Sequence, residues 1–85
     1  MDNNEIRLEL LKIAINEKAL INIDGDNDIQ IDKLKVYFIN DRLQFFNNNA
    51  CIEVPTKDIQ YISHAITLRY IHIHLINGTC QSIKF

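Results

Sequence analysis

The chain closes with Thr67-Leu-Arg-Tyr-Ile-His-Ile-His-Leu-Ile76, then Asn77-Gly78, then Thr79-Cys-Gln-Ser-Ile-Lys-Phe85. Asn-Gly between two runs of β-forming residues predicts a β-hairpin with a type I′ turn, because that turn needs positive φ at both central residues. A two-residue turn sets the register of the two strands. The predicted cross-strand pairs are Ile76 with Thr79, His74 with Gln81, His72 with Ile83 and Tyr70 with Phe85.

This register divides the hairpin side chains between two faces, because successive residues of a strand point to opposite sides. One predicted face carries Tyr70, His72, His74, Gln81, Ile83 and Phe85. The other carries Ile71, Ile73, Leu75, Cys80, Ser82 and Lys84. The second face is the more apolar one on the longer strand. We therefore expect the two histidines to point outward or into a second contact.

Residues 2–17 are predicted to form a helix. Asp2 can cap its N-terminus, and Glu5 follows three residues later, as in a capping box. Two apolar stripes lie side by side at helical spacing. Ile6, Leu10, Ile13 and Ala14 form the first stripe. Leu8, Leu11 and Ile15 form the second.

Together the stripes cover an arc of about 200°, which is wider than the roughly 100° that a helix needs to cover one sheet. We expect the first stripe to face the sheet. The second stripe is then left for another contact, either a curved sheet that wraps the helix or a second subunit. Leu8, Leu11 and Ile15 are therefore the candidate interface residues for self-association.

From Ala19 onward the hydrophobic period changes to two, which is typical of strands. The runs 19–24 and 28–32 flank Gly25-Asp26-Asn27, and 34–40 and 43–46 flank Asp41-Arg42. Asn47–Asn49 is a predicted turn, 51–54 a strand that Pro55 stops, and 59–63 another strand. We predict one α+β domain over residues 1–85, with a helix at 2–17 and a β-meander at 19–85. About seven antiparallel strands form a strongly bent sheet or partial barrel against the helix.

The length and composition limit the class of protein. Eighty-five residues allow one modest core, and no apolar run approaches the ~18–20 residues of a membrane span. Cys51 and Cys80 are too few for a disulfide scaffold, so we interpret them as small buried or half-buried residues in a reducing compartment. We therefore expect a cytoplasmic protein.

Charge is unevenly distributed along the chain. Residues 1–32 hold eight acids and three bases, whereas residues 33–85 hold three acids and six bases. Either the two halves attract each other in the fold, or the basic half binds an anionic ligand such as nucleic acid or an anionic lipid headgroup. Lys35, Arg42, Lys57, Arg69 and Lys84 are the candidate residues for that ligand. Aromatic residues between these bases could stack on nucleic-acid bases on an exposed sheet.

Metal chemistry has one candidate motif, His72-x-His74. Two histidines at this spacing share a strand face, and His64, Glu53 or Gln81 could add a third ligand. No third and fourth ligands stand at a recognisable spacing, so we expect no structural metal and no cofactor. Asp24-x-Asp26-x-Asp28 lacks the glycine and the final glutamate of a calcium loop, and it is predicted to be a solvated acidic turn.

Residues 36–46 (VYFINDRLQFF) and 51–62 (CIEVPTKDIQYI) resemble the sheet of GRAM and bacterial PH-like domains. The strands of those domains often have the sequence pattern "T-x-x-R-L-x-F", followed after a turn by "I-P-x-x-D-I-x-x-I". The resemblance covers about residues 34–85 and implies a partly open β-barrel that contacts protein or lipid without catalysis. This chain differs from that family in ending with a strand rather than a helix.

The sequence therefore favours a small non-enzymatic protein-interaction module, a homodimer or an accessory protein of a phage or mobile element. The alternative is an anionic-ligand binder, and the third possibility is a metal-dependent enzyme that uses His72 and His74.

Overall fold

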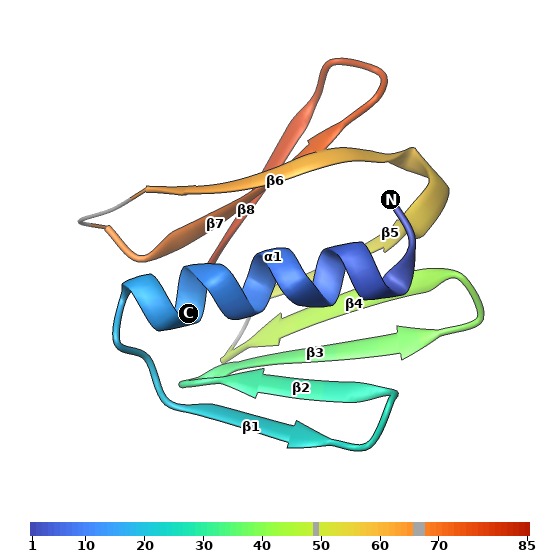
Figure 1. The fold of residues 1–85 in the computed structure, drawn as a ribbon. Helices are drawn as coiled ribbons and strands as arrows, with labels where there is room; N and C mark the ends of the chain where they lie inside the picture. The colour runs from blue at the N-terminus through green and yellow to red at the C-terminus, as the bar shows by residue number, and fades with distance from the viewer. Residues whose placement is uncertain (49, 66–67) are drawn as a thin grey trace.

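The computed structural model describes residues 1–48, 50–65 and 68–85. It has an α+β fold in which one N-terminal helix packs on antiparallel sheets, as predicted (Figure 1). The described residues form eight strands rather than about seven. The elements are α1 (Asn3–Asn16), β1 (Ile21–Asp24), β2 (Asp28–Ile31), β3 (Leu34–Ile39), β4 (Arg42–Asn47), β5 (Ala50–Pro55), the 3₁₀-helix η1 (Thr56–Asp58), β6 (Ile59–Ala65), β7 (Tyr70–Leu75) and β8 (Cys80–Lys84).

The strands form two sheets. One contains β1 to β5 in sequence order, and the other contains β6, β7 and β8. Within the described residues, every pair in both sheets joins consecutive strands in antiparallel orientation. The change of sheet occurs at η1, directly after Pro55, which is the last residue of β5 and pairs with Arg42. Figure 1 shows α1 lying between the two sheets.

Both ends of α1 are set by local hydrogen bonds. Asp2 caps the N-terminus, where its carboxylate accepts from the Glu5 N–H at 2.8 Å. At the other end the Ala19 N–H donates to the Ala14 carbonyl at 2.8 Å, and the Lys18 N–H donates to the Ile15 carbonyl at 3.1 Å. These two bonds form a Schellman motif, with Lys18 at φ 54° in the position that glycine usually takes. The motif turns the chain from α1 directly toward β1.

The helix and both sheets share one hydrophobic core. The first predicted stripe of α1, from Ile6 to Ala14, is buried as expected. The inward positions of the strands and Phe85, which follows β8, complete the core. The strand positions are Ile29, Ile31, Leu34, Val36, Phe38, Leu43, Phe45, Val54, Ile59, Ile62, Ile71, Ile73 and Ile83.

The predicted turn at Asp41-Arg42 lies one residue too late. Ile39 pairs with Arg42, so the two-residue turn is Asn40-Asp41, at φ 47° and 62°. Asparagine and aspartate tolerate the left-handed region better than arginine does, and this selects the earlier pair. Arg42 consequently lies in β4. The three-residue loop at Gly25–Asn27 is as predicted, with Gly25 at φ 70°.

The predicted triple-asparagine turn is only partly described. Asn47 belongs to β4, and Asn48 has φ 50°, which fits a turn. Asn49 lies outside the described residues, as does the predicted start of the terminal hairpin at Thr67. The first described residue of the strand β7 is Tyr70.

The predicted register of the terminal hairpin is wrong by one residue. His74 pairs with Cys80 rather than with Gln81. The loop contains three residues, because the Leu75 N–H donates to the Thr79 carbonyl at 2.9 Å and the Gly78 N–H donates to the Leu75 carbonyl at 3.0 Å. Of the three loop residues Ile76, Asn77 and Gly78, only Gly78 has a positive φ, at 89°. This is the three-residue type, a type I turn followed by a left-handed residue.

Burial explains why the longer loop is used. The observed register pairs Ile71 with Ile83 and places both in the core, whereas the two-residue turn would set Ile83 opposite His72. The Asn77 side chain stabilises this loop. Its Oδ1 accepts two hydrogen bonds from Thr79, one from the backbone N–H at 3.0 Å and one from the side-chain hydroxyl at 2.7 Å.

Gly78→Val is expected to destabilise the fold by about 1 kcal/mol or more, because a β-branched residue at positive φ is strongly disfavoured. A Cβ at Gly78 meets nothing within 4 Å, so the cost comes from the backbone alone. Urea unfolding measures the free energy of unfolding. Gly78→Asn is the matched control and should cost less, because asparagine tolerates this conformation. Equal costs for the two variants would contradict this interpretation of the loop.

Candidate functional site

The outer face of α1 carries large apolar side chains exposed to solvent. Leu8 is 58% exposed and Ile15 is 67% exposed. Leu11, the third predicted interface residue, is half-buried and packs against the core. The second stripe of the helix therefore has two residues free for another contact and one residue shared with the protein's own interior.

The strand β1 continues this apolar face. It is the edge strand of the larger sheet, and all four of its residues are exposed. Ile21 pairs with Ile31 and Ile23 pairs with Ile29, so both point to the side of the sheet that holds the core. Their partners are buried, yet Ile21 remains 37% exposed and Ile23 49% exposed.

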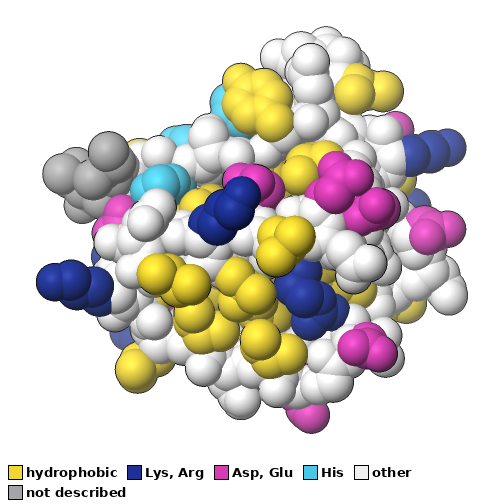
Figure 2. All heavy atoms as spheres, viewed as in Figure 1, with side chains coloured by type: hydrophobic (Ala, Val, Ile, Leu, Met, Phe, Trp, Pro, Cys, Tyr) yellow, Lys and Arg dark blue, Asp and Glu magenta, His cyan; other side chains and the backbone are white. Residues whose placement is uncertain are grey.

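Contacts at both ends keep α1 and β1 side by side. The Schellman motif joins the end of α1 to the start of β1. At the other end, the Arg7 guanidinium donates to the carbonyls of Gly25 and Asp26, just after β1, and lies 4.8 Å from the centroid of the Phe38 ring. Figure 2 shows hydrophobic side chains gathered over the helix and below it toward β1. We call this surface the apolar strip. It consists of Leu8, Leu11, Ile15, Ile21 and Ile23.

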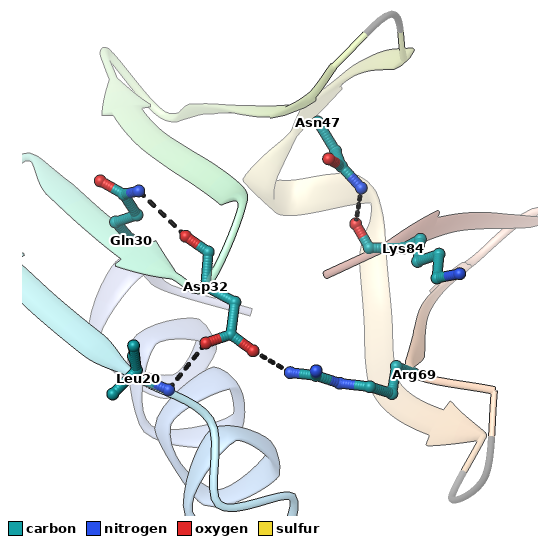
Figure 3. Close-up of polar contacts among 6 residues, drawn as sticks. All are labelled: Leu20, Gln30, Asp32, Asn47, Arg69 and Lys84. Atoms are coloured by element: carbon teal, nitrogen blue, oxygen red, sulfur yellow. Dashed lines mark hydrogen bonds and ion pairs between the residues drawn. The ribbon is translucent and has the colours of Figure 1, made fainter.

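A polar cluster around Asp32 fixes the start of β1 (Figure 3). The Asp32 carboxylate accepts from the Leu20 N–H at 2.8 Å and forms an ion pair with Arg69. The Asp32 N–H donates to the Leu20 carbonyl at 2.9 Å. Close by, the Asn47 side chain donates to the Lys84 carbonyl, which links β4 to β8. Leu20, the residue directly before β1, is therefore held at the place where the two sheets meet.

The hydrogen bond from Arg69 lowers the pKa of Asp32 below its ordinary value, and the bond from the Leu20 N–H lowers it further. Because the pKa is lower in the folded state, this contribution to stability is present above about pH 4, the unfolded value. It is lost as the pH falls through the folded-state pKa.

Asp32→Asn should therefore destabilise the protein at pH 7 and lower its melting temperature. The expected loss in the free energy of unfolding is up to about 1 kcal/mol, the usual range for a solvent-screened ion pair. The asparagine oxygen still accepts from the Leu20 N–H, whereas the amide nitrogen takes the place of the oxygen that accepts from Arg69. The substitution therefore removes the ion pair with Arg69 and keeps the contact with Leu20. Thermal unfolding from pH 7 to pH 2 should show the two proteins converging in acid. Asp24→Asn, at an exposed carboxylate with no ion pair among the described residues, is the control. A constant difference at all pH values would contradict this role.

The five basic residues predicted to bind an anionic ligand lie on different parts of the molecule. Arg42 forms an ion pair with Glu53, with 2.6 Å between Nε and Oε1, and this hydrogen bond lowers the pKa of Glu53. Arg69 pairs with Asp32 and also lies 4.7 Å from the Phe85 ring centroid. Lys35 lies on β3 and Lys84 on β8.

Lys57 and Arg42 line an open depression of about 1150 Å³ at the N-terminal end of α1. Arg7 adds a third cation to its wall, and Asp2, Asp26 and Asp41 contribute carboxylates. The remaining lining residues are Met1, Asn3, Asn4, Asn27, Asn40, Pro55 and Thr56. This mixed polar wall brings together two of the five predicted basic residues.

The three histidines lie on opposite faces of the smaller sheet. His72 and His74 point outward with Tyr61, whose ring stacks on His74 at a centroid distance of 4.0 Å. His64 pairs with the buried Ile71 on the inner face, and its Nε2 lies 3.6 Å from a Glu17 carboxylate oxygen. His64 is therefore directed away from the His72-x-His74 pair.

Each of the two outward histidines has one ring nitrogen hydrogen-bonded to a serine hydroxyl. The Ser63 hydroxyl lies 2.8 Å from Nε2 of His74, and the Ser82 hydroxyl lies 2.6 Å from Nδ1 of His72. Among residues 1–48, 50–65 and 68–85, no group of three or more His, Cys, Asp or Glu side chains is placed to hold a metal ion.

Both cysteines are exposed, which corrects their interpretation as buried or half-buried residues. Cys51 and Cys80 occupy outward positions of β5 and β8, where alternation along the strand directs their side chains to solvent. The acidic turn is exposed at Asp24 and Asp26, as predicted.

The sequence interpretation missed Ile21 and Ile23 as part of the surface. Their alternation with polar residues marks a strand with one apolar face. The pattern does not show that the strand lies at the sheet edge, where this face is only partly covered.

No protein-family model, curated protein or solved structure matches this chain. The resemblance to GRAM and bacterial PH-like domains therefore stays a prediction. In the described part of the chain, no helix has the length and apolar character needed to cross a membrane.

Proposed function

We propose that this chain is a non-enzymatic protein-interaction module that self-associates through the apolar strip. The observation that carries this proposal is the side-by-side placement of exposed apolar residues on α1 and β1. Leu8 and Ile15 stand on the helix, and Ile21 and Ile23 stand on the edge strand. A contiguous apolar surface of this kind is typical of a protein–protein contact.

The size of the strip indicates the strength of the contact. Fully burying one leucine or isoleucine contributes about 1.5–3 kcal/mol, and each of these side chains is already partly covered. Association itself costs about 4–15 kcal/mol. A few half-exposed side chains from each copy therefore support a micromolar dissociation constant rather than a nanomolar one.

The biological role and the cellular location of the protein are proposed from the sequence alone. A small self-associating module without a catalytic motif fits an accessory protein of a phage or mobile element acting in the cytoplasm. These two features stay predictions.

Light scattering after gel filtration should show more than a monomer at micromolar concentration. Leu8→Glu and Ile15→Glu should each return the protein to a monomer, because a charge in the buried contact is strongly disfavoured. Both side chains are exposed in the single chain, so its melting temperature should change little. Leu11→Glu is a poorer test, because Leu11 also packs against the core.

Asn16→Glu is the matched control for these variants. Asn16 is exposed on the same helix and lies about 100° around it from Ile15, on the polar flank. It adds the same charge outside the apolar strip and should leave the association unchanged. A wild-type protein that stays monomeric up to hundreds of micromolar would overturn the proposal.

The open depression favours a second candidate function, the binding of an anionic ligand. Arg7, Arg42 and Lys57 meet there, whereas Lys35 and Lys84 stand apart. Arg7 and Arg42 already hold internal partners, which leaves Lys57 as the side chain best placed for a phosphate.

If this candidate is correct, a fluorescent single-stranded oligonucleotide or anionic vesicles should bind, and binding should weaken steeply between about 50 and 200 mM salt. Lys57→Glu should abolish it. Lys33→Glu, an equal charge change at an exposed lysine outside the depression, should reduce it much less. Equal effects of both variants would indicate non-specific attraction.

A further inference from the structure

The free edge of β1 presents backbone groups in a defined pattern. The Asp32 N–H donates to the Leu20 carbonyl, so Leu20 and Asp32 form a hydrogen-bonded pair. In an antiparallel ladder such pairs alternate, which directs the backbone groups of Asn22 and Asp24 toward β2. The N–H and C=O groups of Ile21 and Ile23 consequently point to the open edge. No strand in the described residues pairs with that edge.

Within β1, Asn22 is flanked by an isoleucine on each side, Ile21 and Ile23. A second copy that pairs antiparallel across a two-fold axis at Asn22 sets Ile21 of each chain opposite Ile23 of the other. Both residues have the outward backbone groups that this pairing needs. All four isoleucine side chains then lie on the side of the joined sheet that carries α1, so the two apolar strips become continuous.

The charges around β1 also suit this pairing. Lys18 precedes the strand, and Asp24 and Asp26 stand at its other end and beyond it. The same two-fold axis brings Lys18 of one copy to the end where Asp26 of the other lies. Each Asp24 faces Leu20 of the other chain, so no carboxylate stands opposite another.

We propose that two copies of this chain pair their β1 strands antiparallel about Asn22, which joins two five-stranded sheets into one sheet of ten strands. This proposal rests on the proposed self-association and specifies its geometry. The interface is isologous, as two-fold dimers require. It satisfies the four outward backbone groups of each strand, which are otherwise an open template for pairing.

Disulfide cross-linking tests the register. In this arrangement the two Asn22 residues form a non-hydrogen-bonded pair with Cα atoms about 4.5 Å apart, within the range that a disulfide spans. The background is Cys51→Ser with Cys80→Ser, because both native thiols are exposed. Adding Asn22→Cys should give a covalent dimer on mild oxidation, seen on a non-reducing gel.

Asp24→Cys in the same background is the matched control. It puts an exposed thiol on the same face of β1 as position 22. In this register, however, the Cα atoms at position 24 of the two chains lie about 13 Å apart, beyond the reach of a disulfide. It should cross-link slowly or not at all. Equal cross-linking of both variants would overturn the register.

Ile23→Pro tests the strand pairing itself. It removes an N–H that no β1–β2 hydrogen bond uses, and proline is tolerated on an edge strand. Its control is Ile23→Ala, which loses the side chain and keeps the N–H. The proline variant should dimerise at least about tenfold more weakly than the alanine variant in sedimentation, because two inter-strand hydrogen bonds are lost per dimer.

The outcomes separate the two levels of the proposal. A dimer that Leu8→Glu dissociates, but that Asn22→Cys does not cross-link, would overturn strand pairing and leave the helix contact standing. A monomer at every concentration would overturn both. Cross-linking of Asn22→Cys only to a different polypeptide would assign the edge to a foreign strand and overturn self-pairing.

Discussion

The carboxylate of Asp32 joins three segments that are far apart in sequence. It lies in the turn between β2 and β3, accepts from Leu20 at the start of β1, and pairs with Arg69 just before β7. Arg69 lies over the ring of Phe85, whose own N–H donates to the Arg69 carbonyl at 3.0 Å. One polar cluster therefore holds the two sheets together at this end, beside the shared core, and it also positions the edge strand on which the proposed contact depends.

The uneven charge of the chain has a structural role in this arrangement. Asp32 belongs to the acidic N-terminal part and Arg69 to the basic C-terminal part. Arg42 is neutralised locally by Glu53. The ion pair between Asp32 and Arg69 uses the charge asymmetry to hold distant segments together, which is one of the two interpretations that the sequence leaves open.

Local patterns predict much of the fold, and long-range contacts decide the rest. The cap at Asp2 and the buried stripe of α1 follow from spacing alone, because both depend on residues within one or two helical turns. The terminal register does not follow from Asn77-Gly78, since that dipeptide fits both a two-residue and a three-residue loop. Burial of Ile83 selects between them, and this depends on a core built from residues throughout the chain.

The candidate surface is predictable to a similar extent. Helical spacing identifies Leu8 and Ile15, which face solvent, together with Leu11, which the fold partly covers. Ile21 and Ile23 join them only because β1 lies at the edge of a sheet and next to the helix. The order of strands in a sheet depends on how all the strands pack together, so the sequence of one strand does not predict whether that strand lies at the edge.

The connection of strands in sequence order also has a consequence for how the chain folds. Each hairpin closes a loop of a few residues, so its formation requires little loss of chain entropy, and such topologies fold faster than those dominated by distant pairings. The contacts of Asp32 with Arg69 and of Asn47 with Lys84 each join residues 37 positions apart. We therefore expect the hairpins to form before the two sheets close around the helix.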